Sequence, residues 1–192
     1  MTIVHLIKTD KDFLKDTIKF FANEYQIDFH SLHVAIYSVN IGCLLGFDEK
    51  KLVQLALAAL FMDIGLKAVN ANITDSTLSL HELKQEHLQQ HPQYSINILE
   101  HNRIHDPYII EGILHHHERY DGSGYPKGLQ EREISPFSAI LGICDTFDAL
   151  TNERPYRKQL TYFEALKFMI NDPSMKNKFN ISYLKIFLKS LL

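Results

Sequence analysis

Apolar residues recur every three or four positions along most of this chain, which is the spacing of one face of an α-helix. After Asp48 the recurring residues are Leu52, Leu55, Ala56, Ala59 and Leu60. No segment shows the two-residue alternation that indicates a half-buried strand. We therefore predict an all-α fold.

Residues that start and stop helices support this prediction. The start signals are Asp28, Asp48, a capping box of Ser79 and Glu82, Asp106-Pro107 and Ser135-Pro136. Gly46 ends the first helix near Leu45, and Pro92 must interrupt the third near His91. Two further helices are predicted near 162–170 and 181–191.

Two segments are predicted to be loops. Residues 66–78 are polar, and residues 120–133 contain three glycines and a proline. Long loops in compact helical domains often carry function. Gly122, Gly124 and Gly128 do not have the spacing of a dinucleotide-binding fingerprint, and no strand precedes them.

Composition and charge exclude several classes of protein. The 192 residues are 45% apolar and have a formal net charge of −3, so no basic field attracts DNA, RNA or anionic lipid. No signal peptide or membrane span is apparent. Cys43 and Cys144 are expected to be free thiols in a reducing cytoplasm. We expect residues 1–27 to be a helical lead-in to a domain of residues 28–192, together one globular unit.

The chain contains eleven histidines, three of them consecutive. On a helix that begins at Pro107, the apolar stripe of residues 109, 110 and 113 continues to His116 and His117, while His115 faces solvent. Two inward imidazoles need partners, because an unsatisfied buried polar group costs about 1–3 kcal/mol. They are either core histidines bonded to carbonyl groups or metal ligands.

Single polar residues also interrupt apolar helical segments elsewhere. These are His30, Asp63, His91 and Asp145, with Asp148 one turn after Asp145. Helical bundles build metal sites from such residues on several helices, and a lone buried carboxylate is costly unless it is paired or metal-bound. Without a cysteine ligand, the imidazole and carboxylate set fits Mn, Fe, Zn or Ni. Four of the other histidines, at positions 5, 81, 101 and 105, are predicted to lie at the surface.

At this point the sequence resembles the HD-GYP domains, a branch of the HD metal-dependent phosphohydrolases that hydrolyse cyclic di-GMP. The segment HHERYDGSGYPKGL, from His116 to Leu129, is similar to the signature of that family. CDTFDALTNERPYR, from Cys144 to Arg157, resembles its second signature. The resemblance extends from about Asp28 to Arg157.

The resemblance implies a role for each matching residue. One metal would be held by His30, Asp63 and Asp145, and a second by Asp63, His91, His116 and His117, with Asp63 bridging the two. Gly124, Tyr125 and Pro126 would form the GYP loop at the substrate mouth, where a partner such as a GGDEF-type domain would dock. Tyr125, Arg154 and Arg157 would contact the substrate. In the family, two metals, Fe or Mn in the first place, activate water to cleave cyclic di-GMP to pGpG or GMP.

The sequence departs from the family at four positions. Met62 replaces a histidine ligand of the first metal, and a thioether is a weak ligand for Fe(II) or Mn(II). Leu66 replaces a lysine expected to neutralise substrate phosphate, and Gln26 replaces the glutamate of three-metal members. His33 replaces an arginine and is a candidate substitute ligand. We expect one intact metal site, one impaired site and no third.

Three functions remain open. The departures at Met62 and Leu66, beside a retained Tyr125, favour a module that binds cyclic di-GMP or docks a partner, with weak or lost hydrolysis. The alternative is an active phosphodiesterase that tolerates Met62, with His33 completing the site. A metal-binding structural bundle is the third, and it leaves the GYP loop unexplained.

Overall fold

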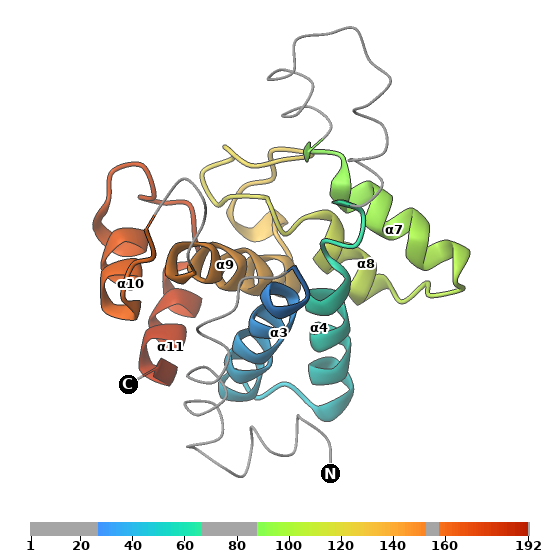
Figure 1. Cartoon of the computed structure of the whole chain (residues 1–192), viewed down its shortest axis with the longest axis horizontal. Helices are drawn as coiled ribbons and strands as arrows, with labels where there is room; N and C mark the ends of the chain where they lie inside the picture. Colours follow the sequence, from blue (N-terminus) through green and yellow to red (C-terminus); the bar gives the residue numbers. More distant parts are fainter. Residues whose placement is uncertain (1–26, 67–87, 153–157, 192) are drawn as a thin grey trace, which may run out of the picture.

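The computed structural model describes residues 27–66, 88–152 and 158–191 (Figure 1). Its helices are α3 (Ile27–Leu44), α4 (Glu49–Phe61), α7 (His91–His101), α8 (Pro107–Leu114), α9 (Pro136–Thr151), α10 (Tyr162–Asn171) and α11 (Ile181–Leu191), with a short 3-10 helix, η2 (Glu131–Glu133). Over these ranges there is no strand, only an isolated bridge between Asp121 and Gln130. The predicted all-α fold is confirmed.

Helix α3 is the element on which the others are assembled. It packs against α4, α9 and α11, and it is buried along most of its length (Figure 1). Helix α8 contacts α4 and α9, and α7 lies against α8. Helices α10 and α11 pack on the other end of α9, so the described helices surround one large apolar core, beside which Val39 and Leu52 form a small second cluster.

The predicted N-caps explain where most helices begin. Asp48, Asp106 and Ser135 each accept a hydrogen bond from a backbone N–H two or three residues further on, as a capping side chain does. Asp28 is an exception, because α3 already includes it and begins at Ile27. Most of the expected lead-in lies outside the described residues.

The helix boundary predicted at Pro92 is confirmed, but His91 lies on the other side of it. Residues 89–90 form a turn, and His91 is the first residue of α7 rather than the last residue of the preceding helix. A proline is tolerated in the first helical turn because its missing N–H has no partner there. Pro92 therefore starts a helix, and the histidine stands at its N-terminus.

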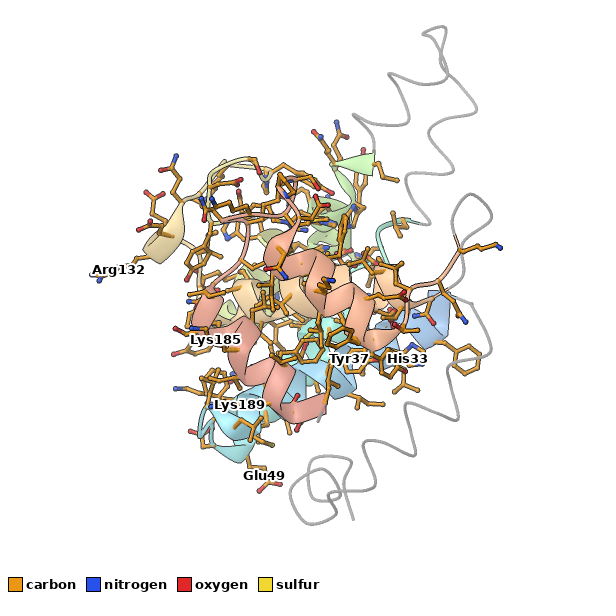
Figure 2. All side chains as sticks on the ribbon, turned by 90° about the vertical axis from the view of Figure 1, so that its left-hand side faces the viewer. His33, Tyr37, Glu49, Arg132, Lys185 and Lys189 are labelled. Carbon is orange, nitrogen blue, oxygen red and sulfur yellow. The ribbon has the colours of Figure 1, made fainter. Side chains whose placement is uncertain are left out.

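Helix α11 closes the core. Leu184 and Phe187 are buried, and the Phe187 ring meets the rings of Tyr37 and Phe147 edge to face, with centroids 5.6 and 4.8 Å apart. Lys185 of the same helix is exposed (Figure 2). The contact joins α3, α9 and α11 behind the region where the polar residues gather.

Two further observations concern the whole of the described chain. None of the helices in the described ranges has the length and apolar character needed to cross a bilayer. Cys144 is buried, Cys43 is half-buried, and neither is in a disulfide. The prediction of free thiols is confirmed.

The turn after α4 is pressed against the start of α7. The hydroxyl of Ser95 donates to the Met62 carbonyl at 2.7 Å and accepts from the Gly65 N–H at 2.9 Å. A Cβ atom on Gly65 would collide with the carbonyl oxygen of His91 and lie 2.5 Å from the Ser95 nitrogen. Only glycine permits this approach, which sets Asp63 beside His91.

We therefore expect Gly65→Ala to lower the free energy of unfolding by about 2–3 kcal/mol, because backbone atoms rather than a flexible side chain must move. Gly46→Ala is the matched control. Gly46 has φ +77° and open space around it. An alanine there therefore costs only the backbone strain of a left-handed conformation, about 1 kcal/mol. Urea unfolding of both variants measures the difference, and equal losses would contradict the close approach.

Candidate metal centre

Five segments bring the six predicted metal ligands to one place. His30 comes from α3, Asp63 from the turn after α4, His91 from the start of α7, His116 and His117 from the turn after α8, and Asp145 from α9. Each of the six lies within 4 Å of another member through a nitrogen–oxygen contact. The structure thus brings together residues that are up to 115 positions apart in the sequence.

Asp63 occupies the middle of this group. Its Oδ1 lies 3.2 Å from the Nε2 of His91 and 3.9 Å from that of His116, whereas its Oδ2 lies 3.3 Å from the Nε2 of His30. Burial alone would raise the pKa of Asp63, but hydrogen bonds with His30 and His91 hold it well below its ordinary value. The carboxylate therefore remains ionised, with one oxygen facing each half of the site.

The tautomers of His91 and His116 follow from their backbone contacts. The Nδ1 of His91 donates to the Leu88 carbonyl at 2.6 Å, and that of His116 donates to the Ile113 carbonyl at 2.7 Å. Burial lowers the pKa of His116, which favours its neutral form. A neutral ring that is protonated at Nδ1 has a lone pair at Nε2.

The Nε2 atoms of His91 and His116 are 3.4 Å apart, and the carboxylate of Asp63 lies beside them. Two ring nitrogens and a carboxylate this close together need a proton or a cation between them. The ligand atoms of His91, His116 and His117 all lie within 4.8 Å of one another. This donor set of nitrogen and oxygen atoms fits a divalent Fe, Mn, Zn or Ni ion.

His117 lies at the outer edge of the same cluster. Its ring centroid is 4.0 Å from that of His116, and its Nδ1 is 3.9 Å from Asp145. Burial lowers the pKa of His117 well below its usual value, and the nearby basic groups of His116 and Arg119 act in the same direction. The ring of Tyr125 stacks on that of His117, with the ring centroids 4.7 Å apart.

The other half of the site contains His30 and Asp145. The Nε2 of His30 lies 3.4 Å from Asp145, in addition to its contact with Asp63. Burial disfavours the charged imidazole, but hydrogen bonds to Asp145, Asp148 and Asp63 outweigh it and raise the pKa of His30 well above 6.5. Burial acts against the charged Asp145 as well, yet His30 and His117 lower its pKa. A positive charge is thus favoured in this half too.

The side chain of Met62 offers neither a nitrogen nor an oxygen atom to the site. It is completely buried, and its side chain belongs to the hydrophobic core. Leu66 is half-buried at the end of the described segment. Three predicted site residues, Gln26, Arg154 and Arg157, lie outside the described residues.

The GYP loop is tied to the histidine turn by a buried acid. Glu118 accepts the backbone N–H of Lys127 at 2.7 Å and that of Leu129 at 2.9 Å. The Tyr125 N–H donates to the His117 carbonyl at 3.3 Å, and a Cβ on Gly124 would lie 2.5 Å from the Arg119 nitrogen. The loop therefore lies directly over the residues that follow His117.

The sequence prediction for His115 is wrong, because this residue is buried rather than exposed. Helix α8 ends at Leu114, so the helical spacing used to orient His115 no longer applies at that position. His101 and His105 are exposed as predicted, whereas His5 and His81 lie outside the described residues.

Sequence reasoning also missed two contacts behind His30. Asp148 is completely buried and lies 2.6 Å from the Nδ1 of His30 and 2.8 Å from the Nδ1 of His33. The three-residue spacing of Asp145 and Asp148 on one helix was the signal that could have placed both carboxylates on the same side of α9. His33 is engaged with Asp148 through that nitrogen.

The model of the HD domain family matches residues 8–176, and this chain belongs to that family, whose members bind divalent metal. Among curated relatives, the chain is 33% identical over 140 residues to the cyclic di-GMP phosphodiesterase PA4108 of Pseudomonas aeruginosa, covering 73% of this chain and 34% of that protein. It is 36% identical over 142 residues to the 3'3'-cGAMP-specific phosphodiesterase 3 of Vibrio cholerae, covering 73% of this chain and 30% of that protein. The chain thus spans about a third of the length of these relatives.

Solved structures show the same fold. An HD-GYP-type protein of Bdellovibrio bacteriovorus, Bd1817, superposes with a TM-score of 0.75 at 22% identity, covering 98% of this chain and 60% of that one. A cyclic GMP-AMP specific phosphodiesterase of V. cholerae gives a TM-score of 0.66 at 19% identity, covering 93% of this chain and 47% of that one. The HD-family fold expected from the sequence is confirmed.

We expect Glu118→Gln to loosen the GYP loop. A glutamine side chain has one acceptor oxygen and no charge, so it cannot accept both backbone N–H groups as the Glu118 carboxylate does. The loss should be about 1–3 kcal/mol of local stability, the usual cost of an unsatisfied buried donor. Hydrogen exchange at the Lys127 and Leu129 amides measures it directly. Glu111→Gln, an exposed change on α8, is the control, and equal exchange in both variants would show that Glu118 does not hold the loop.

Proposed function

We propose that this chain is a metal-binding HD-GYP module that recognises a cyclic dinucleotide and hydrolyses it weakly or not at all. The observation that carries the proposal is the 3.4 Å approach of the His91 and His116 Nε2 atoms beside the Asp63 carboxylate. The complete donor set of this half supports one retained metal. Its relatives act on cyclic di-GMP or 3'3'-cGAMP, which supports a cyclic dinucleotide as the ligand class.

In this proposal Asp63, His91, His116 and His117 hold the retained ion, Fe or Mn in the first place. His30, Asp63 and Asp145 would hold a second ion more weakly. Divalent ions at such a site lower the pKa of water and offset the negative charge of a phosphodiester. The role of the ligand residues is to hold the ions in position beside the phosphodiester.

Tyr125 is proposed to contact the ligand. Its ring lies against His117, and burial raises the pKa of its phenol, so the hydroxyl stays protonated at neutral pH. A protonated phenol can donate a hydrogen bond to a phosphate oxygen. Arg154 and Arg157 remain proposed phosphate contacts, because guanidinium groups match phosphate geometry.

Weak hydrolysis follows from two replacements in the same half of the site. Met62 leaves the ion near His30 with one imidazole fewer, and Leu66 supplies no positive charge for the phosphate. Each loss of transition-state stabilisation of this kind costs several kcal/mol, a rate decrease of about 10³. Recognition needs fewer groups than catalysis and is retained in this proposal.

An active phosphodiesterase is the second candidate, and one observation favours it. His30, Asp63 and Asp145 still converge, with the His30 Nε2 only 3.3 and 3.4 Å from the two carboxylates. A second ion could therefore bind there without a ligand from position 62.

The GYP loop is also proposed as a docking surface for a protein such as a GGDEF-type domain. Pro126 and Lys127 of this loop are exposed, while Glu118 fixes their backbone from below. A reducing cytoplasm is the proposed compartment, and the absence of a disulfide at Cys43 and Cys144 fits it.

We expect protein purified anaerobically with Fe(II) or Mn(II) to bind cyclic di-GMP or 3'3'-cGAMP, with turnover at least about 10³-fold below that of an intact two-metal site. Calorimetric titration measures binding, and chromatography of the linear dinucleotide and mononucleotide products measures hydrolysis. Tyr125→Phe is expected to weaken binding about tenfold, because it removes one hydrogen bond from a charged phosphate.

Each outcome separates the candidate functions. Binding with little or no turnover supports the proposed module, whereas ready turnover establishes the phosphodiesterase instead. A metal-loaded protein that binds neither dinucleotide would contradict both and leave a structural metal-binding bundle.

Met62→His combined with Leu66→Lys is expected to restore what the site lacks. The double variant should bind a second metal equivalent and raise turnover by at least about tenfold, since both substitutions act on transition-state charge. Metal content and product formation are the two measurements.

Met62→Leu combined with Leu66→Lys is the matched control, because it keeps the core position apolar. Circular dichroism establishes that the double variant is folded. If folded protein carrying Met62→His and Leu66→Lys gains neither metal nor turnover, Met62 and Leu66 are not the cause of the weak hydrolysis.

A further inference from the structure

We infer that Asp148 and His33 act together as positioning residues that hold His30 in the orientation a metal ligand needs. This inference rests on the proposed metal centre, because it concerns the half of that centre that lacks a histidine at position 62. It also assigns His33 a role different from that of a substitute ligand.

The first observation is the saturation of the Asp148 carboxylate. Asp148 is completely buried, and its Oδ2 accepts from the Nδ1 of His30 at 2.6 Å. Its Oδ1 accepts from the Nδ1 of His33 at 2.8 Å and from the Asn152 amide at 2.7 Å. Three donors therefore hold one buried anion, and two of them are imidazoles on the same helix.

The second observation is the tautomer that this contact selects. An ionised carboxylate can only accept, so the Nδ1 of His30 must carry the proton. The other ring nitrogen, Nε2, is thereby left to face the metal site, where it lies 3.3 and 3.4 Å from the carboxylate oxygens of Asp63 and Asp145. A partner on the non-ligating nitrogen is how proteins orient histidine ligands.

The third observation explains why a distant residue is required. His91 and His116 each use a carbonyl three residues earlier in the chain, at a helix start and after a helix end. His30 lies within α3, where the backbone carbonyl groups are taken by the helix itself. Its Nδ1 partner must come from another element, and α9 supplies Asp148 across the helix contact.

His33 completes the arrangement from the next turn of α3. Residues three apart on a helix share a face, so one carboxylate can span both imidazoles. The ring of His33 lies 6.4 Å from that of Tyr37, one turn further along the helix and buried in the aromatic core contact (Figure 2). His33 thus links Asp148 to the rigid part of the core and restrains the carboxylate that orients His30.

The test compares variants of the full chain by titration with Mn(II), followed by electron paramagnetic resonance. Wild-type protein should show a tight site and a weaker one near His30. Asp148→Asn should weaken the weaker site about 10–100-fold, the usual effect of losing an orienting partner, and leave the tight site within about threefold. Asn152→Ala removes the third donor to the Asp148 carboxylate, together with its bond to the Asp148 carbonyl, but leaves both imidazole contacts, so both sites should stay within about threefold.

His33 variants distinguish positioning from ligation. His33→Asn keeps an amide N–H near the position of Nδ1 and should retain the weaker site, whereas His33→Leu should weaken it about tenfold. Loss of metal in His33→Asn equal to that in His33→Leu would make His33 a ligand and overturn the inference. An Asn152→Ala effect as large as that of Asp148→Asn would show general loosening of the core and would also overturn it.

Nuclear magnetic resonance of ¹⁵N-histidine-labelled, chelator-treated protein gives a second readout that needs no metal. The short His30–Asp148 contact should give a downfield Nδ1 proton that disappears in Asp148→Asn, and an unchanged His30 signal contradicts the inference. Protein that takes up no ion near His30 even at millimolar Mn(II) overturns the positioning role alone. Failure of the tight site would instead overturn the proposed function.

Discussion

A carboxylate placed between imidazole nitrogens, with little exposure to solvent, is the constraint around which this domain is organised. Asp63 directs one oxygen at His91 and His116 and the other at His30, so three helical segments must converge on a single side chain. A charge in such a place costs several kcal/mol unless opposite charge compensates for it. In the apo protein the proton on His30 supplies part of that charge, and a divalent ion would supply more. The need to compensate the charge of Asp63 therefore affects both the packing of the helices and the binding of metal.

Contacts of backbone with backbone hold the ligands at the required separations. Gly65 lets the turn after α4 touch the start of α7, and Gly142 of α9 lies where a Cβ would be 2.8 Å from the His116 carbonyl. The guanidinium of Arg119 donates to that same carbonyl at 3.0 Å, and Glu118 binds the GYP loop from the adjacent position. The histidine turn is thus fixed from below by α9 and from above by the loop.

The sequence predicted the helical class and three of the N-caps, because helical spacing and capping chemistry are local properties. The proposed ligand set came from the resemblance to the HD-GYP domains, and the structure brings those six side chains together. The sequence prediction misplaced His91 and His115, since both lie where a helix begins or has just ended and periodicity stops being informative there. Asp148 was visible as a carboxylate but not as a partner of His30, because that contact joins residues 118 positions apart. Which buried polar groups meet depends on how the helices pack, and the pattern of one helix does not contain that information.

The claim that matters most is that the cluster of His91, His116, His117 and Asp63 holds a divalent ion. Crystals of the protein grown with Mn(II) and measured on both sides of the manganese absorption edge test it directly. The account predicts a strong anomalous peak between the nitrogen atoms of these three histidines and Asp63, with a weaker peak or none beside His30. The absence of a peak within this cluster, in crystals that show manganese elsewhere on the chain, would contradict it.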